Sequence, residues 1–337
     1  MADLNDEWES FLNSEYSHDS SDNVSKLDLN NEMPKCGDIC ISTKTKITNL
    51  SIKNINIKDI FWKIPIINYT DRTNGIIKKQ VKYSCHSKEN YDELQEIKKN
   101  IKCLNISTIK HVDDPNGYNK NFNYVCKINV GISKKDLLCY RTKVKKAFFN
   151  CCVLVYRIYY DNEYKEINMK IFNSGKISFP GMLTDELLVK TLSELTQMLS
   201  KILNIDIDYY SDDIDTVLIN SNFNCGYYIN RDKFSEILKY KYNVPIEYDP
   251  CSYPGIKCTY TKENINVSFM IFRTGSILIV GKCDETQLYD IYLYIKDILY
   301  KEYKNINMDN NVINQKKKPK KKCKYKQIYI KNEITTV

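Results

Sequence analysis

The sequence contains few of the residues and patterns on which several large classes of protein depend. Only three histidines occur among 337 residues, and no stretch approaches the eighteen apolar residues that mark a transmembrane helix. Neither a phosphate-binding G-x-x-x-x-G-K-[ST] loop nor an H-E-x-x-H motif is present. The first ten residues, MADLNDEWES, are acidic where a secretory signal would be basic and then apolar. We therefore expect a soluble protein that is neither secreted nor inserted in a membrane, and we do not expect an enzyme.

Cysteine is abundant, with thirteen residues, but its spacing is irregular. Disulfide frameworks belong to short secreted chains, so reduced and mostly buried thiols are expected here. Cys36 and Cys40 are followed by no matching pair, and the histidines are only His18, His86 and His111. A zinc site is therefore not expected, nor is any other metal or cofactor.

Charge is distributed unevenly along the chain. Residues 1–40 carry ten acids and two lysines, a net charge of −8, whereas residues 316–337 carry nine lysines and one glutamate, a net charge of +8. Since the total is also +8, residues 41–315 are basic by the same amount. A basic body between an acidic arm and a basic tail indicates a polyanionic partner, although lysine-rich surfaces also serve solubility alone.

The strongest signal in the sequence is an internal repeat. Residues 171–203, IFNSGKISFPGMLTDELLVKTLSELTQMLSKIL, align without a gap with residues 271–303, IFRTGSILIVGKCDETQLYDIYLYIKDILYKEY. Each copy predicts a strand, a tight turn at Gly175 or Gly275, a second strand and then a helix.

The helix of each copy has a start signal and one apolar stripe. We expect Thr184 to cap the first helix, and Asp284 with Gln287 to form a capping box at the second. Apolar residues at helical spacing should pack on the sheet. These residues are Leu188, Leu192, Leu195 and Leu199 in the first copy, and Leu288, Ile291, Ile295, Ile298 and Leu299 in the second.

The beginnings of the two halves are less alike. Residues 46–64 resemble residues 217–238, which places Asn49 opposite Asn220. Residues 67–83 resemble residues 246–260, which places Ile77-Lys78 opposite Ile256-Lys257. The first half is longer by about 71 residues, and most of this excess is expected at residues 84–145, as a decorated loop or a small extra module.

These observations divide the chain into four parts. Residues 1–40 form an acidic arm whose composition predicts disorder. Residues 41–205 form the first repeat, with its insertion at about 84–145, and residues 206–304 form the second repeat. Residues 305–337 form a basic tail.

Three segments resemble the TATA-binding protein family. They are TNLSIKN, YDPCSYPGIKC and the doubled IF-x-[ST]-G followed by a strand, a glycine and a helix. The resemblance covers roughly residues 41–83 and 146–304, and it is closest to the divergent versions carried by large cytoplasmic DNA viruses. It implies an α+β fold in which two pseudo-repeats form one curved antiparallel sheet, a saddle with helices on its convex face.

The resemblance also implies a set of DNA-contacting residues. Asn49 and Asn220 match the paired asparagines that bond to acceptors at the centre of the minor groove. Phe172, Phe272 and Tyr253 match aromatic wedges that enter between base steps and help to kink the duplex.

The remaining wedge, which belongs to the first half, has two candidate positions. Alignment on NGIIKK gives Thr73 or Asn74, whereas alignment on KAFFNCCVLVYRI gives Phe148 or Phe149. We favour Phe149, because the strand that follows it leads directly into NMKIFNSG. Phosphate contacts at the edges of the footprint are expected from basic residues. These are Lys53, Lys78, Lys176, Lys257, Arg157 and Arg273.

The implied function is that of a transcription initiation factor that binds AT-rich promoter DNA in the minor groove and bends it. Its expected partners are double-stranded DNA, an RNA polymerase and a IIB-like factor, with the protein a monomer on DNA. The alternative is a scaffold of the same fold that docks polymerase or a IIB-like factor without bending DNA. The expected location is a cytoplasmic viral factory or the virion, or the nucleus if the basic segment 316–326 acts as an import signal.

The acidic arm offers a second, weaker motif. Trp8, Phe11 and Leu12 are spaced to share one helical face. The arm is expected either to fold onto a basic surface or to remain a solubility tail.

Overall fold

The computed structural model describes residues 34–101, 104–114, 122–138, 148–182, 184–262 and 265–308. The aromatic motif of the acidic arm and the basic tail lie outside these residues. The described residues from Lys35 onward belong to one compact unit. Its described strands form a twelve-stranded sheet in which each pair of neighbours is antiparallel.

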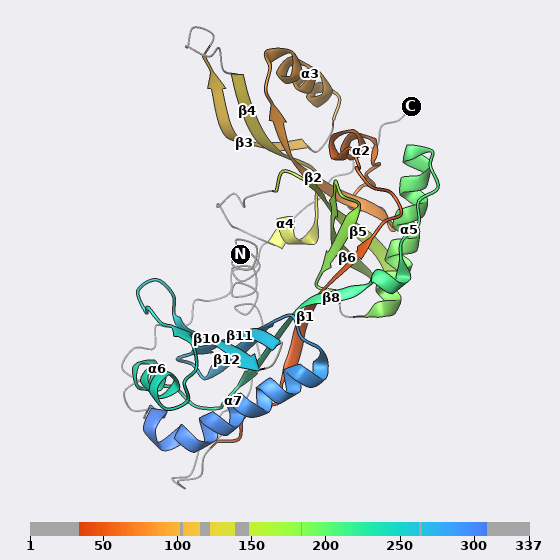
Figure 1. Ribbon diagram of the computed structural model, residues 1–337. Helices are drawn as coiled ribbons and strands as arrows, with labels where there is room; N and C mark the ends of the chain where they lie inside the picture. Colours follow the sequence, from red (N-terminus) through yellow and green to blue (C-terminus); the bar gives the residue numbers. More distant parts are fainter. Residues whose placement is uncertain are drawn as a thin grey trace. The chain divides into compact units, whose positions relative to one another are not determined.

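The elements of the first half are described in chain order (Figure 1). They are β1 (Cys40–Asn49), α2 (Ile57–Lys63), β2 (Gly75–Cys85), α3 (Lys88–Lys99), β3 (Leu104–Asp113), β4 (Phe122–Gly131), α4 (Lys134–Leu138), β5 (Cys151–Tyr160), β6 (Glu163–Phe172), β7 (Lys176–Pro180) and α5 (Asp185–Leu203). A short 3₁₀ turn, Ser211–Asp213, leads into the second half.

The second half contains fewer elements. They are β8 (Asp215–Asn224), α6 (Arg231–Tyr240), β9 (Ile246–Glu247), β10 (Gly255–Lys262), β11 (Ile265–Phe272), β12 (Ser276–Gly281) and α7 (Glu285–Ile306).

The strand order is symmetric about a central pair formed by β1 and β8. Outward from β1 the neighbours are β7, β6, β5 and β2, and outward from β8 they are β12, β11, β10 and β9. The first half then continues with β4 and β3, which come from the segment between β2 and β5. The fold is thus an α+β fold with a large open antiparallel sheet, as expected.

The two long helices, α5 and α7, each present one apolar stripe to the sheet. Leu188, Leu192, Leu195 and Leu199 of α5 are buried in the core of the first half, and the predicted stripe of α7 is buried as well. On β1, Lys44 and Lys46 point to the starts of the two long helices, where they pair with Glu285 of α7 and Asp185 of α5. The helices α5 and α7 therefore begin on the same face of the sheet.

The expected helix caps are confirmed at one helix and not at the other. Asp284 and Gln287 form the capping box of α7. Thr184 occupies the N-cap position of α5 but makes no side-chain cap hydrogen bond. The acidic pair Asp185 and Glu186 in the first turn of α5 supplies the favourable charge instead.

The expected pairing of Ile77-Lys78 with Ile256-Lys257 is wrong. By strand order, β10 corresponds to β5, and β2 corresponds to the short β9. Lys257 pairs with Met270 of β11, and the residue that pairs with Lys170 at the same place in β6 is Val153. The two sequence segments look alike because both are half-buried strands that follow a glycine.

Candidate nucleic-acid interface

The two faces of the central strands differ in character. On β8, Ile219, Ser221 and Phe223 are buried, and the ring of Phe223 contacts Tyr292 of α7 at 4.9 Å between centroids. Because side chains alternate along a strand, their neighbours point to the other side of the sheet. We name this side, opposite to α5 and α7, the open face. Its residues on the central strands are Thr43, Thr45, Ile47 and Asn49 of β1, and Leu218, Asn220, Asn222 and Asn224 of β8.

Two amide side chains lie on the open face across the seam between the halves. The Nδ2 of Asn220 donates to the hydroxyl of Thr43 at 2.7 Å, and the Nδ2 of Asn222 donates to the hydroxyl of Ser42 at 2.7 Å. A primary amide has two N–H donors, so each retains one for a further partner. Asn222 was not among the expected contacts, although the alternation of Asn220, Asn222 and Asn224 in NSNFN marks a polar face.

The expected pairing of Asn49 with Asn220 is wrong. Asn49 pairs with Lys176, the first residue of β7, and Asn224 pairs with Ser276, the first residue of β12. The counterpart of Asn49 is therefore Asn224. The partner of Asn220 on β1 is Thr43, six residues from Asn49 and thus roughly 20 Å along the strand. The centre is formed by two amides of β8 and two hydroxyls of the first half.

The aromatic residues near the ends of β6 and β11 occupy matching places. Phe172 and Phe272 are half-buried on the open face, whereas Ile171 and Ile271 beside them are fully buried on the helix side. Phe272 pairs with Gly255, and the Tyr253 ring two residues earlier lies 6.0 Å from the Phe272 ring. Burial raises the pKa of Tyr253 to about 12, so its hydroxyl stays protonated at neutral pH.

The first half repeats this relation with Phe149. Phe172 pairs with Cys151, and Phe149 precedes Cys151 by two residues, as Tyr253 precedes Gly255. Phe149 is exposed, and the Lys82 ammonium lies 3.3 Å from the centre of its ring. The alternative candidate Asn74 is engaged elsewhere, since its amide donates to Glu194 of α5 and accepts from the Tyr159 N–H.

Gly255 lies beneath the two aromatic rings of Tyr253 and Phe272, which we name the second-half ring pair; Phe149 and Phe172 are the first-half ring pair. A Cβ atom at this position would lie 3.0 Å from the rings of both Phe272 and Tyr253. The Pro-Gly sequence after Tyr253 thus leaves room for two aromatic side chains to meet above the strand.

The expected phosphate contacts fall into two groups. Lys53, Lys176 and Arg273 are exposed in or beside turns. Lys78 forms an ion pair with Asp136 of α4 at 2.6 Å, and Lys257 lies 3.2 Å from Glu247. The second group therefore offers positive charge that is already partly neutralised.

Arg157 does not fit the expected role of a phosphate contact. It is buried, with 7% of its surface exposed. Its guanidinium donates to the carbonyl oxygen of Asp71 at 2.8 Å and lies over the Tyr69 ring at 4.6 Å. A buried arginine stacked on an aromatic ring and bonded to the backbone holds a loop in place. The sequence alone did not distinguish it from a surface arginine.

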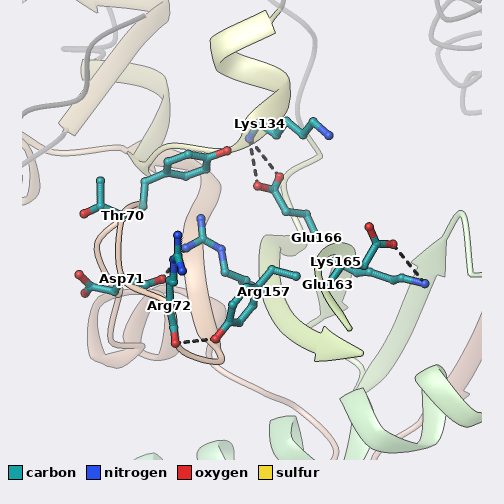
Figure 2. Close-up of a pocket in the computed structure, with 10 residues that line it drawn as sticks. Thr70, Asp71, Arg72, Lys134, Arg157, Glu163, Lys165 and Glu166 are labelled. Carbon is teal, nitrogen blue, oxygen red and sulfur yellow. Dashed lines mark hydrogen bonds and ion pairs between the residues drawn. The ribbon is translucent and has the colours of Figure 1, made fainter. Parts of the chain in front are cut away.

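Arg157 lines a cavity of about 550 Å³ between the loop at residues 69–72, the start of β6 and α4 (Figure 2). Glu166 accepts hydrogen bonds from the backbone N–H of Lys134, and Tyr164 donates to the carbonyl of Arg72. Burial and then Glu166 raise the pKa of Tyr69. Basic and acidic side chains alternate around the cavity, which gives it no dominant charge. Its lining is Tyr69, Thr70, Asp71, Arg72, Lys134, Arg157, Glu163, Tyr164, Lys165 and Glu166.

No helix within the described part of the chain is long and apolar enough to cross a membrane. The described sheet thus has two related halves, with α5 and α7 on one face and aromatic side chains at matching places on the other face.

Comparison with known proteins shows which families and structures the chain is similar to. Residues 216–302, from β8 into α7, match the family model of "Transcription factor TFIID (or TATA-binding protein, TBP)". A curated relative, the "TATA-box-binding protein-like" protein of Acanthamoeba polyphaga mimivirus, is 27% identical over 203 residues, which are 52% of this chain and 55% of that protein. The chain thus spans about half the length of this relative. The chain is thus similar to the TATA-binding protein family over its second half and to a viral TATA-box-binding protein-like relative over the aligned residues.

Among solved structures, Methanococcus jannaschii TBP is similar at a TM-score of 0.39 and 15% identity. The match covers 78% of this chain and 99% of the archaeal chain.

Proposed function

We propose that this protein is a transcription initiation factor that binds AT-rich promoter DNA in the minor groove through the open face and bends it. The observation that carries the proposal is the arrangement of aromatic residues. Phe172 with Phe149 and Phe272 with Tyr253 occupy matching places in the register of the two halves, on either side of the central pair.

The centre of the open face suits the chemistry of the minor groove. A·T and T·A pairs show only acceptors there, and a G·C pair adds the guanine amino group as a donor. The second N–H of Asn220 and of Asn222 is suited to acceptors. Amide donors at the centre and rings at the ends are the combination that a minor-groove binder needs to read and kink a duplex.

The experiment is a fluorescence measurement of the distance between the ends of an AT-rich duplex. The wild-type protein should bring the ends together, and the Phe172→Ala/Phe272→Ala variant should lose most of this change. Unstacking a base step costs a few kcal/mol, which the lost rings would no longer supply. Lysine-dependent weak binding should persist. Equal bending by both proteins would contradict the proposal.

A second candidate function is favoured by one feature of α7. Tyr289, Leu293 and Tyr300 are exposed at helical spacing on its outer side, the last by 70%. Such a stripe suits a protein partner such as an RNA polymerase or a IIB-like factor. If the protein is a scaffold that does not bend DNA, neither the wild type nor Phe172→Ala/Phe272→Ala would change the distance between the ends of the duplex. The Tyr289→Ala/Tyr300→Ala variant serves as a matched control, because it removes two aromatic rings and should leave bending intact.

A further inference from the structure

The sheet of the first half is wider than that of the second half. Beyond β5, the second half has in the equivalent place only the two residues of β9. The first half continues with β2, β4 and β3, each of ten or eleven residues. Since neighbouring strands lie about 4.8 Å apart, β4 and β3 widen the sheet by roughly 10 Å. We name β2, β4 and β3 together the sheet extension.

One face of the sheet extension is closed by α3. Leu94 of this helix is fully buried in the core together with Cys126 and Ile128 of β4. The Tyr91 ring contacts the Tyr124 ring at 4.8 Å between centroids. The aromatic residues of the inserted segment are thus used to attach the extension to the fold.

The other face continues the open face and has a different composition. It presents lysines, neutral amides and hydroxyls, and none of the strand residues described on this face is a carboxylate. They are Lys78, Gln80, Lys82 and Ser84 of β2, Asn123, Val125, Lys127 and Asn129 of β4, and Asn105, Ser107, Lys110 and Val112 of β3. Of these, Val125 and Lys127 are buried and Lys78 is paired with Asp136 of α4, so Lys82 and Lys110 carry the argument. Lysines, amides and hydroxyls are the donors that contact phosphate and sugar in DNA complexes.

Register places these residues directly outside the first-half ring pair. Phe172 lies opposite Cys151 of β5, and the next residue of β5, Cys152, pairs with Val81 of β2. Lys82, the next residue of β2, stands opposite Lys127. The Lys82 ammonium lies over the Phe149 ring, and burial lowers the pKa of Lys82. An anionic partner at this point would favour the charged form of the amine.

We propose that the sheet extension is a second DNA-contacting surface, which binds the sugar-phosphate backbone of the duplex beyond the first-half ring pair. This inference rests on the proposed function. A widening of roughly 10 Å corresponds to about three base pairs of B-form DNA. The second half lacks these strands, so the DNA contact is longer on one side and the protein has a preferred orientation on its site.

The test compares two duplexes that share one AT-rich core, a short one limited to the core and one extended on both sides. The variant is Lys82→Gln/Lys110→Gln, since Lys127 is largely buried and its replacement would disturb folding. The matched control is Lys88→Gln/Lys99→Gln, which removes the same charge from exposed positions of α3 on the opposite face.

The wild-type protein and the control should bind the extended duplex more tightly, with hydroxyl-radical protection reaching further at one end. Lys82→Gln/Lys110→Gln should lose this gain and reduce the slope of log Kd against log salt by about two on the extended duplex only. Equal loss on both duplexes, or symmetric protection, would overturn the sheet extension as a DNA surface and leave the proposed function standing. Absence of binding to either duplex would overturn both.

Discussion

A single buried carboxylate, Glu302, joins two helices of the second half. Glu302 of α7 is buried, and its carboxylate accepts hydrogen bonds from Lys241 at 2.6 Å and from the Tyr242 hydroxyl at 2.8 Å. Asn305 donates to the other oxygen at 2.8 Å. The bond from Lys241, ahead of the other contacts, lowers the pKa of Glu302 to about 2. Through these bonds the end of α6 is fastened to α7.

The first prediction concerns the pH dependence of this contact. The folded pKa lies below the ordinary value, so the contribution of Glu302 to stability is complete above about pH 4.5 and is lost as pH falls towards 2. Glu302→Gln should lower the free energy of unfolding by about 1.5 to 3 kcal/mol at pH 7. In urea titrations at several pH values the gap between the two proteins should close near pH 2. Glu285→Gln, in an exposed pair with Lys44, should cost less than about 1 kcal/mol.

If the gap between wild type and Glu302→Gln were independent of pH, the stabilising role of the ionised carboxylate would be refuted.

The amides at the seam allow a second prediction at the same scale. Asn220→Ala/Asn222→Ala should reduce the preference for a central A·T over a central G·C pair by about 1 to 3 kcal/mol, because the amide donors are removed. Competition between two duplexes that differ only at the centre measures this preference. Asn224→Ala, near the turn and away from the seam, should retain the preference. A double variant that discriminates as well as the wild type would show that the seam amides do not read the groove.

At the scale of elements, the two strand-turn-strand units depend on glycine for a specific reason. Gly175 and Gly275 have φ angles of +87° and +81°. A Cβ atom would lie 2.1 Å from the Ile52 carbonyl oxygen at the first position and 2.3 Å from the Tyr227 carbonyl oxygen at the second. Each turn is thus pressed against the backbone of the loop that follows the first strand of its half.

We therefore predict that Gly175→Ala and Gly275→Ala each lower the free energy of unfolding by more than about 2 kcal/mol, since strained φ and steric overlap add. Gly181 distinguishes the cost of the strained φ angle from the cost of steric overlap. It has a φ angle of +85°, but a Cβ atom there would meet nothing within 4 Å. Gly181→Ala should cost only about 1 kcal/mol, and thermal unfolding of the three variants measures the difference. Equal costs at all three positions would argue against the close approach.

The elements that were predictable from sequence are those with a strong local pattern. The stripes of α5 and α7, the capping box at Asp284 and both glycine turns follow from periodicity and turn chemistry. The partners of β2 did not follow, because a half-buried strand has the same pattern whether β5 or β6 lies beside it. The prediction that Asn49 corresponds to Asn220 was wrong for the same reason, since register is a property of pairs of strands.

Residue roles were less predictable than elements. Arg157 and Lys78 read as surface charges, but one is buried against Tyr69 and the other is paired with Asp136. Phe149 is predicted from the strand that follows it, and its place relative to Phe172 matches that of Tyr253 relative to Phe272. Its contact with a base step stays a prediction.

At the scale of the whole molecule, a nearly symmetric strand order carries an asymmetric surface. The central amides come from β8 alone, and the extra strands flank only the first half. A symmetric binder would sit on a near-palindromic site in two orientations. If the proposed function holds, each asymmetry distinguishes the two directions along the duplex, and that direction would decide which strand is copied.

The rims of the sheet also have a consequence for solubility. At one rim β9 is only two residues long, and at the other the outermost strand, β3, is interrupted by an irregularity between Thr108 and Lys110. A short rim and a bulged, lysine-bearing rim are poor templates for a further strand. Copies of this protein at high concentration should therefore remain separate instead of pairing edge to edge into fibres.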